Sequence, residues 1–279
     1  MIRLAVRVER AQSDQALAEL LVLSPAGLEE VEIDEHTIEY VVYGYEGELP
    51  SLPTLEASIG EALVTVTTSE IADDWSERWR VFHQPIVVAD RLHVRPPWHE
   101  PASGLIDVVI DPGQAFGTGA HATTRLCLEL LVDIECAGRA SGALLDIGCG
   151  SGVLAIAAAK LGYAPVAALD LDPVCIEATL ANAAANGVTL EARQSDLRTD
   201  PLPPAPTIVA NLLLGPLLEL SSRLEHPPAV LIASGLLAPQ GDELAADLGA
   251  RHGLQEHERR IDSEWLAMLF AGADPRVSS

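Results

Sequence analysis

Alternating apolar and polar positions mark a small domain at the start of the chain. Four segments have the alternation or the apolar run of strands: residues 2–8, 27–33, 37–43 and 64–67. Two segments have apolar residues at helical spacing: residues 13–23, with Ser13 as a suitable N-cap, and residues 55–63. The order strand-helix-strand-strand-helix-strand is that of a ferredoxin-like module. The sequence therefore predicts an α+β domain over residues 1–68.

A longer alternation of strands and helices starts near residue 104. Five apolar runs predict the strands of a parallel sheet: residues 143–147, 165–169, 188–192, 206–210 and 229–234. Helical patterns occupy the intervals, among them residues 125–134 and 153–160, and an antiparallel pair is expected near residues 254–260 and 265–271. This order is typical of a doubly wound α/β sheet, so we predict a Rossmann-like domain over residues 102–279.

Residues 69–101 are predicted to connect the two domains. They contain several prolines and three of the four tryptophans, Trp75, Trp79 and Trp98, and residues 74–80 suit one short helix. The tryptophans either pin the connector onto a domain or form part of a substrate surface.

The most informative local pattern is an acidic residue followed by three glycines at every second position, Asp146, Gly148, Gly150 and Gly152, between a predicted strand and a predicted helix. Glycine permits positive φ and the close approach of a ligand, and N–H groups at the helix start offer donors. A dinucleotide fingerprint needs a glycine where Val153 stands, so it is excluded. The spacing resembles instead the first motif of Rossmann-like methyltransferases that use S-adenosylmethionine.

Polar residues follow other predicted strands at the carboxyl end of the sheet, where ligands bind in this fold class. Asp170 ends the second strand, and its carboxylate can accept hydrogen bonds from both ribose hydroxyls. Asp196 follows the third strand, and Asn211 follows the fourth. The amide of Asn211 can orient an amine without charging it. We expect Gly148, Asp170, Asp196 and Asn211 to line one crevice, and the alternative is a glycine turn that binds no ligand.

Residues 111–124, D-P-G-Q-A-F-G-T-G-A-H-A-T-T, are too unusual for an ordinary loop and precede the first strand of the sheet. Phe116 can pack on a cofactor, and Gly117 allows its close approach. Thr124 brings a hydroxyl to the start of the following helix. We expect this loop to belong to the same site as the glycine turn.

Charge and composition narrow the classes of partner. The 279 residues include 41 acidic and 17 basic side chains, a formal charge of −24, which argues against direct binding of nucleic acid. The acidity either serves solubility or attracts a basic partner. Four cysteines without C-x-x-C spacing suggest neither a zinc site nor a disulfide framework. No apolar stretch reaches the roughly 20 residues of a membrane helix, and arginines interrupt each candidate apolar region of a signal peptide, so we expect a cytoplasmic protein. We also expect a monomer.

These motifs together resemble the PrmA family, the methyltransferases of large-subunit ribosomal protein eleven. The resemblance rests on the loop 111–124, D-I-G-C-G-S-G from residue 146, L-D-L-D-P around Asp170 and A-N-L-L-L-G-P-L from residue 210. It covers nearly the whole chain, including D-W-x-x-x-W from residue 74. It implies a Class I methyltransferase domain joined by the linker to a ferredoxin-like substrate-recognition domain. Ala122, where the family often has proline, is a departure that affects only local loop geometry.

The resemblance implies a set of residues that bind S-adenosylmethionine or line its pocket: Phe116, Gly117, His121, Thr124, Gly148, Asp170 and Asn211. Gly150 and Asp196 join this set through their places in the glycine loop and at a strand end. The implied reaction transfers methyl groups to lysine ε-amines and to the N-terminal α-amine, with no metal. Asn211 is the expected catalytic residue, because it can orient the amine. His121 is either a general base or a residue that fixes the loop.

Other functions fit parts of the same pattern. A Class I methyltransferase acting on another protein or on a small molecule has the same catalytic domain, and the N-terminal domain discriminates between them. A non-catalytic protein that senses S-adenosylmethionine or docks on ribosomes and an NAD-dependent dehydrogenase are further alternatives, which cofactor titration separates.

Overall fold

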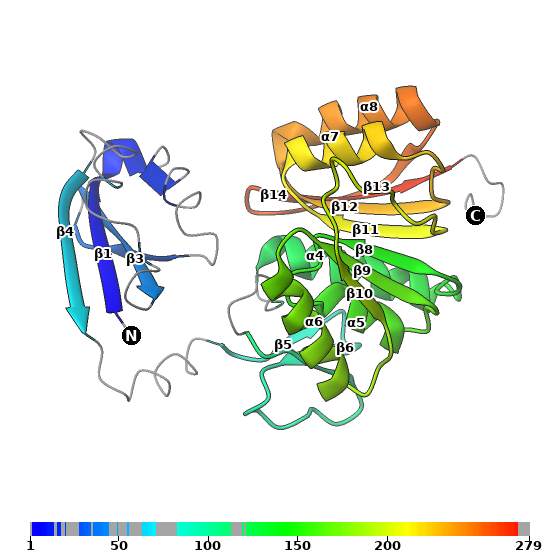
Figure 1. The fold of residues 1–279 in the computed structure, drawn as a ribbon, viewed down its shortest axis with the longest axis horizontal. Coiled ribbons are helices and arrows are strands. Elements are labelled where there is room, and N and C mark those ends of the chain that lie inside the picture. The colour runs from blue at the N-terminus through cyan, green and yellow to red at the C-terminus, as the bar shows by residue number, and fades with distance from the viewer. Residues whose placement is uncertain are drawn as a thin grey trace. The chain divides into compact units, whose positions relative to one another are not determined.

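The computed structural model describes residues 2–13, 16–17, 20, 28–34, 36–44, 49, 55, 63–70, 83–112, 119 and 121–272. The chain divides into two compact units, Met1–Phe82 and His83–Ser279 (Figure 1). The second unit thus begins before residue 102, where the sequence predicts the start of the larger domain.

The first unit contains a four-stranded antiparallel sheet. Its elements are β1 (Ile2–Glu9), η1 (Arg10–Gln12), β2 (Glu29–Glu32), β3 (Thr37–Gly44) and β4 (Leu63–Glu70). The strand order β2-β3-β1-β4, antiparallel throughout, agrees with the predicted module. The predicted helices at 13–23 and 55–63 lie mostly outside the described residues. Their described residues Ala16, Leu20 and Leu55 are buried in the core against the sheet.

The second unit is built on a seven-stranded sheet with the order β10-β9-β8-β11-β12-β14-β13. Its strands are β8 (Leu144–Ile147), β9 (Val166–Asp170), β10 (Glu191–Gln194), β11 (Thr207–Asn211), β12 (Val230–Leu237), β13 (Gln255–Asp262) and β14 (Trp265–Ala271). The first five run parallel, whereas β14 lies antiparallel between β12 and β13. The predicted doubly wound sheet and its final antiparallel pair are confirmed. The third strand starts later than residue 188.

Helices cover both faces of this sheet, as its apolar strands require. The helices are α4 (Ala122–Cys136), α5 (Val153–Lys160), α6 (Pro173–Ala185), α7 (Leu214–Arg223) and α8 (Gly241–His252), with the short η3 (Ala238–Gln240). The first three share one core with one face of the sheet, and α7 and α8 share the other (Figure 1). Successive strand residues alternate between the two cores, as Leu144 and Leu145 do in β8.

A small three-stranded sheet joins the second unit beside α4. It consists of β5 (Ile86–Val88), β6 (Leu92–Arg95) and β7 (Ile106–Val109). Val88, Leu92 and Val94 are buried in the core that contains α4 and α5. Residues 83–101, which the sequence assigns to the linker, therefore belong to the second unit. These strands have only three or four residues each and lie near prolines, so their alternation of apolar and polar residues is too short to recognise in the sequence.

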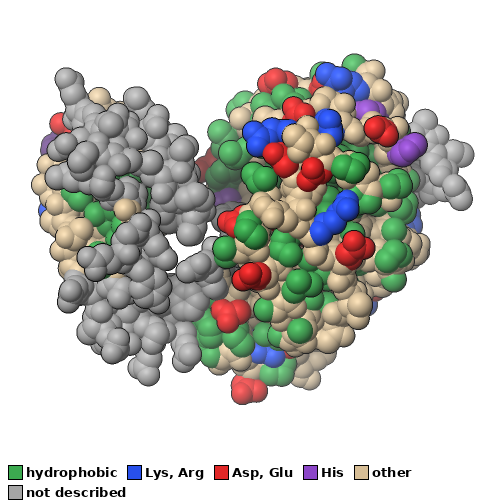
Figure 2. Space-filling model, in the orientation of Figure 1, with side chains coloured by type: hydrophobic (Ala, Val, Ile, Leu, Met, Phe, Trp, Pro, Cys, Tyr) green, Lys and Arg blue, Asp and Glu red, His purple; other side chains and the backbone are tan. Residues whose placement is uncertain are grey.

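The tryptophans of residues 69–101 and the charge on one face of the second unit bear on the expected substrate surface. Trp75 and Trp79 lie outside the described residues, and Trp98 is half-buried. Acidic, basic and hydrophobic side chains are interspersed over the face of the second unit in Figure 2, so the negative charge is not gathered in one patch there. Each helix within the described ranges is too short or too polar to span a membrane.

Candidate functional site

The glycine loop after β8 has the backbone that its sequence predicts. Gly148, Gly150 and Gly152 have φ angles of 74°, 53° and 82°. These values lie in the left-handed region, which is costly for residues with a Cβ. The loop leads directly into α5, so the predicted turn between strand and helix is confirmed.

The N–H groups of this loop are directed largely toward the neighbouring strand. The N–H groups of Gly148 and Cys149 donate to the carbonyl of Leu169 at 2.8 and 3.0 Å. The N–H of Gly150 donates to Oδ2 of Asp170 at 2.9 Å. Contact with β9 therefore satisfies these three N–H groups, which precede the helix start where the sequence predicts donors for a ligand. What the three glycines contribute is a backbone without side chains of its own at every second position.

Asp170 lies at the end of β9 with its carboxylate fixed by two backbone groups. Oδ2 accepts from Gly150, and Oδ1 accepts from the N–H of Asp172 at 3.0 Å. A carboxylate oxygen can accept more than one hydrogen bond. Asp170 is thus rigidly oriented while each oxygen keeps capacity for a ligand hydroxyl, as recognition of a ribose requires.

Asp146, the first residue of the glycine motif, lies beneath this surface. Its side chain is fully buried, and Oδ2 accepts from the N–H of Ala155 near the start of α5 at 3.0 Å. Oδ1 has no hydrogen-bond partner among the described residues. Burial raises the pKa of the Asp146 carboxyl to about 7, because removing the charge from water is costly. Asp146 therefore supports the loop and helix from inside the core.

Asn211 lies at the end of β11 and contacts the start of α4. Its Nδ2 donates to Oγ1 of Thr123 at 3.1 Å and to Oγ1 of Thr124 at 3.3 Å. Both threonines are buried. The two N–H bonds of the amide are thereby occupied, and Oδ1 is the atom able to accept from a ligand. The structure thus brings together two residues, Asn211 and Thr124, that the sequence predicts for one site.

His121 fixes the first turn of α4. Its Nδ1 lies 2.8 Å from Oγ1 of Thr123 and accepts from the Thr123 N–H at 3.4 Å, as an N-cap does. Its ring meets that of Trp265 edge to face, with centroids 5.0 Å apart. Burial lowers the pKa of His121, although the negative charge of Glu264 opposes this shift. A neutral imidazole agrees with the accepting role of Nδ1.

The glycine loop and the Asn211 cluster are direct neighbours. Ile147 at the end of β8 pairs with Leu169 on one side and with Ala210 on the other. A Cβ added to Gly148 would lie 2.4 Å from Cδ2 of Leu212, so this side chain fills the space over the glycine. The two clusters therefore form one continuous surface at the carboxyl edge of the sheet.

The remaining predicted residues have different surroundings. Asp196 lies just after β10, where both carboxylate oxygens accept from the Arg198 guanidinium at 2.9–3.0 Å. Hydrogen bonds from Arg198 lower the pKa of Asp196. Its charge is therefore already paired in this structure. Phe116 and Gly117 lie outside the described residues.

The structure adds polar groups that the sequence did not single out. Ser195 follows β10, and its N–H donates to the Asp170 carbonyl at 2.8 Å. Its buried Oγ has no partner among the described residues. Ser234 of β12 is buried and donates to the Leu266 carbonyl at 2.8 Å and to that of Thr123 at 3.3 Å. The sequence could have indicated Ser234, because it is a serine within an otherwise apolar strand.

Four features define a Rossmann-like methyltransferase fold: the strand order, the glycine turn after the first strand of the main sheet, the acid at the end of the second and the amide at the end of the fourth. The family model described as "Ribosomal protein L11 methyltransferase (PrmA)" matches residues 10–272. The chain therefore belongs to this family.

Individual relatives agree with this assignment. The chain is 44% identical over 178 residues to a ribosomal protein L11 methyltransferase from Azotobacter vinelandii, covering 62% of this chain and 60% of that one. It is 39% identical over 237 residues to one from Dechloromonas aromatica, covering 79% and 76%. A crystal structure of ribosomal protein L11 methylase from Lactobacillus delbrueckii subsp. bulgaricus matches with a TM-score of 0.62 at 29% identity, over 69% of this chain and 100% of that one. The chain spans 60–66% of the length of the first curated relatives it matches.

The raised pKa of Asp146 predicts a specific dependence of stability on pH. The unfolded carboxyl titrates near its ordinary value of 3.8 and the folded one near 7, so this contribution to stability is complete below the first value and lost as pH rises to the second. Between about pH 5 and about pH 7, wild type should lose on the order of 2 kcal/mol relative to Asp146→Asn. Denaturant unfolding at both pH values measures this, and parallel pH curves for the two proteins would contradict it.

Leu212 lies close to Gly148, so a side chain at this position should weaken cofactor binding, whereas a control substitution at Gly138 should not. Gly148→Ala should lower the free energy of unfolding by about 1 kcal/mol through its positive φ, and displace Leu212. Gly138→Ala has a similar φ of +68° but open space around its Cβ, so it should carry the cost of the positive φ without the added cost of the contact with Leu212. Only Gly148→Ala should weaken S-adenosylmethionine binding, by about 10-fold or more, in calorimetric titration. Equal affinities in both variants would show that Gly148 is not part of the binding surface.

Proposed function

We propose that this protein transfers methyl groups from S-adenosylmethionine to amino groups of ribosomal protein L11, the lysine ε-amines and the N-terminal α-amine. The observation that carries the proposal is the Asn211 amide, held by two threonine hydroxyls beside the glycine loop, in a chain that belongs to this family. We propose further that the first unit recognises the substrate and the second catalyses the transfer.

The residues at the carboxyl edge suit a nucleoside without a pyrophosphate. Asp170 offers fixed acceptors for ribose hydroxyls, and the glycine loop allows close approach of a ligand. Thr124 and His121 border the same surface. Residues assigned to S-adenosylmethionine under this proposal also include Gly148, Gly150, Asp196, Phe116 and Gly117. When bound, S-adenosylmethionine supplies a methyl group already activated by a sulfonium.

The amine acceptor must be oriented and uncharged to attack this methyl group. A lysine with a pKa near 10.4 has to lose a proton, which costs roughly 4 to 5 kcal/mol at pH 7. Desolvation lowers this cost because it disfavours the ammonium form. Oδ1 of Asn211 can accept one N–H of the amine and direct its lone pair, while water takes the released proton.

His121 acts in this scheme as a residue that fixes the loop. Its Nδ1 is occupied by the cap of α4, so that nitrogen is unsuited to take a proton from the substrate. Its lowered pKa favours the neutral ring, which adds no positive charge beside a sulfonium. The structure therefore supports the loop-fixing interpretation over the general base.

A basic substrate agrees with the formal charge of −24, which favours its approach at low salt. The proposed substrate is tested by incubating the protein with labelled S-adenosylmethionine and a mixture of unmethylated ribosomal proteins, followed by mass spectrometry. Label on L11 lysines and on its N-terminus is expected. Label on another protein alone would favour a Class I methyltransferase of different specificity.

Substitution of Asn211 tests the proposed mechanism. Asn211→Ala removes the acceptor for the amine, and we expect turnover at saturating S-adenosylmethionine to fall by about 100-fold or more. Asn211→Asp keeps an oxygen at this position, and its threonine neighbours can donate to it, so it should retain more turnover than Asn211→Ala. Single-turnover kinetics measures both variants. An unchanged rate in Asn211→Ala would remove this residue from the mechanism.

A further inference from the structure

The glycine loop is held from behind by side chains of α6. Oγ1 of Thr179 donates to the Gly150 carbonyl at 3.0 Å, and Nδ2 of Asn182 donates to the Ser151 carbonyl at 2.9 Å. Thr179 is fully buried, and Asn182 is 3% exposed. A Cβ on Gly152 would lie 2.9 Å from Thr179, so helix and loop are in direct contact. The loop conformation therefore depends on α6 as well as on its glycines.

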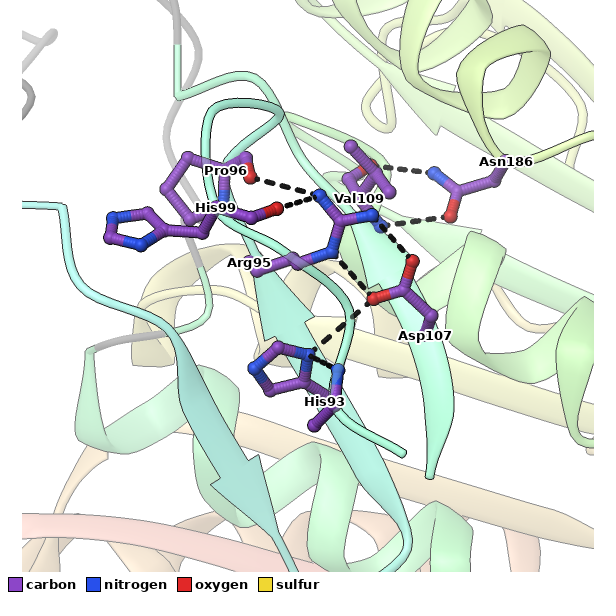
Figure 3. A network of polar contacts seen from close by, with 8 residues as sticks. His93, Arg95, Pro96, His99, Asp107, Val109 and Asn186 are labelled. Carbon is purple, nitrogen blue, oxygen red and sulfur yellow. Dashed lines mark hydrogen bonds and ion pairs between the residues drawn. The ribbon is translucent and has the colours of Figure 1, made fainter. Parts of the chain in front are cut away.

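The same helix holds the segment that leads into the loop 111–124. Oδ1 of Asn182 accepts from the N–H of Asp111 at 2.9 Å. One turn later, Asn186 accepts from the N–H of Val109 at 2.8 Å and donates to its carbonyl at 2.6 Å (Figure 3). Val109 ends β7, and residues 111–124 follow it. Both asparagines thus fix the backbone just before this loop.

Strand β7 is itself fixed on its other side. The guanidinium of Arg95 on β6 donates to both carboxylate oxygens of Asp107 at 2.7 and 2.8 Å (Figure 3). Arg95 also donates to the carbonyls of Pro96 and His99, which orders the turn after β6. The position of β7 is therefore well determined. Because α6 bonds to both β7 and the glycine loop, the position of β7 constrains that of the loop.

Asn182 differs from its neighbours because one amide bonds both segments. Its Nδ2 reaches Ser151 in the glycine loop, and its Oδ1 reaches Asp111. The side-chain hydrogen bonds of Thr179 reach the glycine loop, and those of Asn186 reach β7 and its own helix. We propose that Asn182 is a positioning residue that sets the spacing between the two loops that bind S-adenosylmethionine. This inference rests on the proposed function.

An amide suits this position because it is uncharged and both donates and accepts. Removing it takes away the donor to the Ser151 carbonyl and the acceptor for the Asp111 N–H, and the loss of hydrogen bonds made by a buried amide is costly. The two loops then lose their shared constraint, which weakens binding of the cofactor. Asn211 is on β11 and its amide bonds to Thr123 and Thr124, not to Asn182, so turnover with bound cofactor should change little. A weaker affinity for S-adenosylmethionine with a nearly unchanged turnover is therefore the expected result for a positioning residue.

The test compares Asn182→Ala with Asn186→Ala, the same change one helical turn apart. Calorimetric titration measures the Kd for S-adenosylmethionine, thermal unfolding measures stability, and steady-state kinetics separates KM from kcat. Asn182→Ala should raise the Kd by about 10-fold or more, whereas Asn186→Ala should stay within about twofold of wild type. Both variants should lose stability and keep a kcat within about threefold of wild type. Equal Kd values in the two variants, or a kcat loss without a Kd change, would overturn the inference.

A second pair keeps the test decisive if the alanine variant does not fold. Asn182→Asp preserves shape and the acceptor for Asp111 but replaces the donor to Ser151, and Asn186→Asp introduces the same charge nearby as its control. Only Asn182→Asp should weaken binding, again by about 10-fold. Equal affinity in this pair would overturn the inference while leaving the proposed function intact. Failure of wild type to bind S-adenosylmethionine would instead overturn the proposed function.

Discussion

In a parallel sheet the carboxyl ends of all strands lie at one edge. The register of β8, β9 and β11 brings the residues at the ends of these three strands together there. Ile147 pairs with both Leu169 and Ala210. Gly148, which follows β8, therefore lies between the end of β9, where Asp170 stands, and the end of β11, where Asn211 stands. Parallel strands also require cover on both faces, which the helices supply. The position of the site follows from this packing.

The polar groups near this edge are rigid because most of them are buried with their partners. Backbone groups of the glycine loop bond to β9 and to α6, and the Asn211 amide bonds to two threonines. Buried polar groups without partners are costly, so each pair resists displacement. Among the described residues near this edge, Oδ1 of Asp146 on β8 and Oγ of Ser195 have no hydrogen-bond partner. Burial of the Asp146 carboxyl raises its pKa.

Much of the fold could be predicted because periodicity and turn chemistry are local properties. The strands of the main sheet and the glycine turn follow from residues close in sequence. The small sheet of β5 to β7 was missed because its strands are too short to show a period. The contact between His121 and Trp265 and the bonds of Asn182 were missed for another reason. These contacts join segments far apart in sequence, and no local sequence pattern predicts them.

The sequence by itself determined the order of elements, the glycine turn and the identity of the polar residues at the strand ends, because these depend on local backbone preference and side-chain chemistry. Only the tertiary structure decided which polar atoms remain able to bind a ligand. The Gly150 N–H is occupied by Asp170, the Asn211 amide donates to Thr123 and Thr124, and Asp196 is paired with Arg198. Most of these partners come from different elements, and such hydrogen bonds are set by packing.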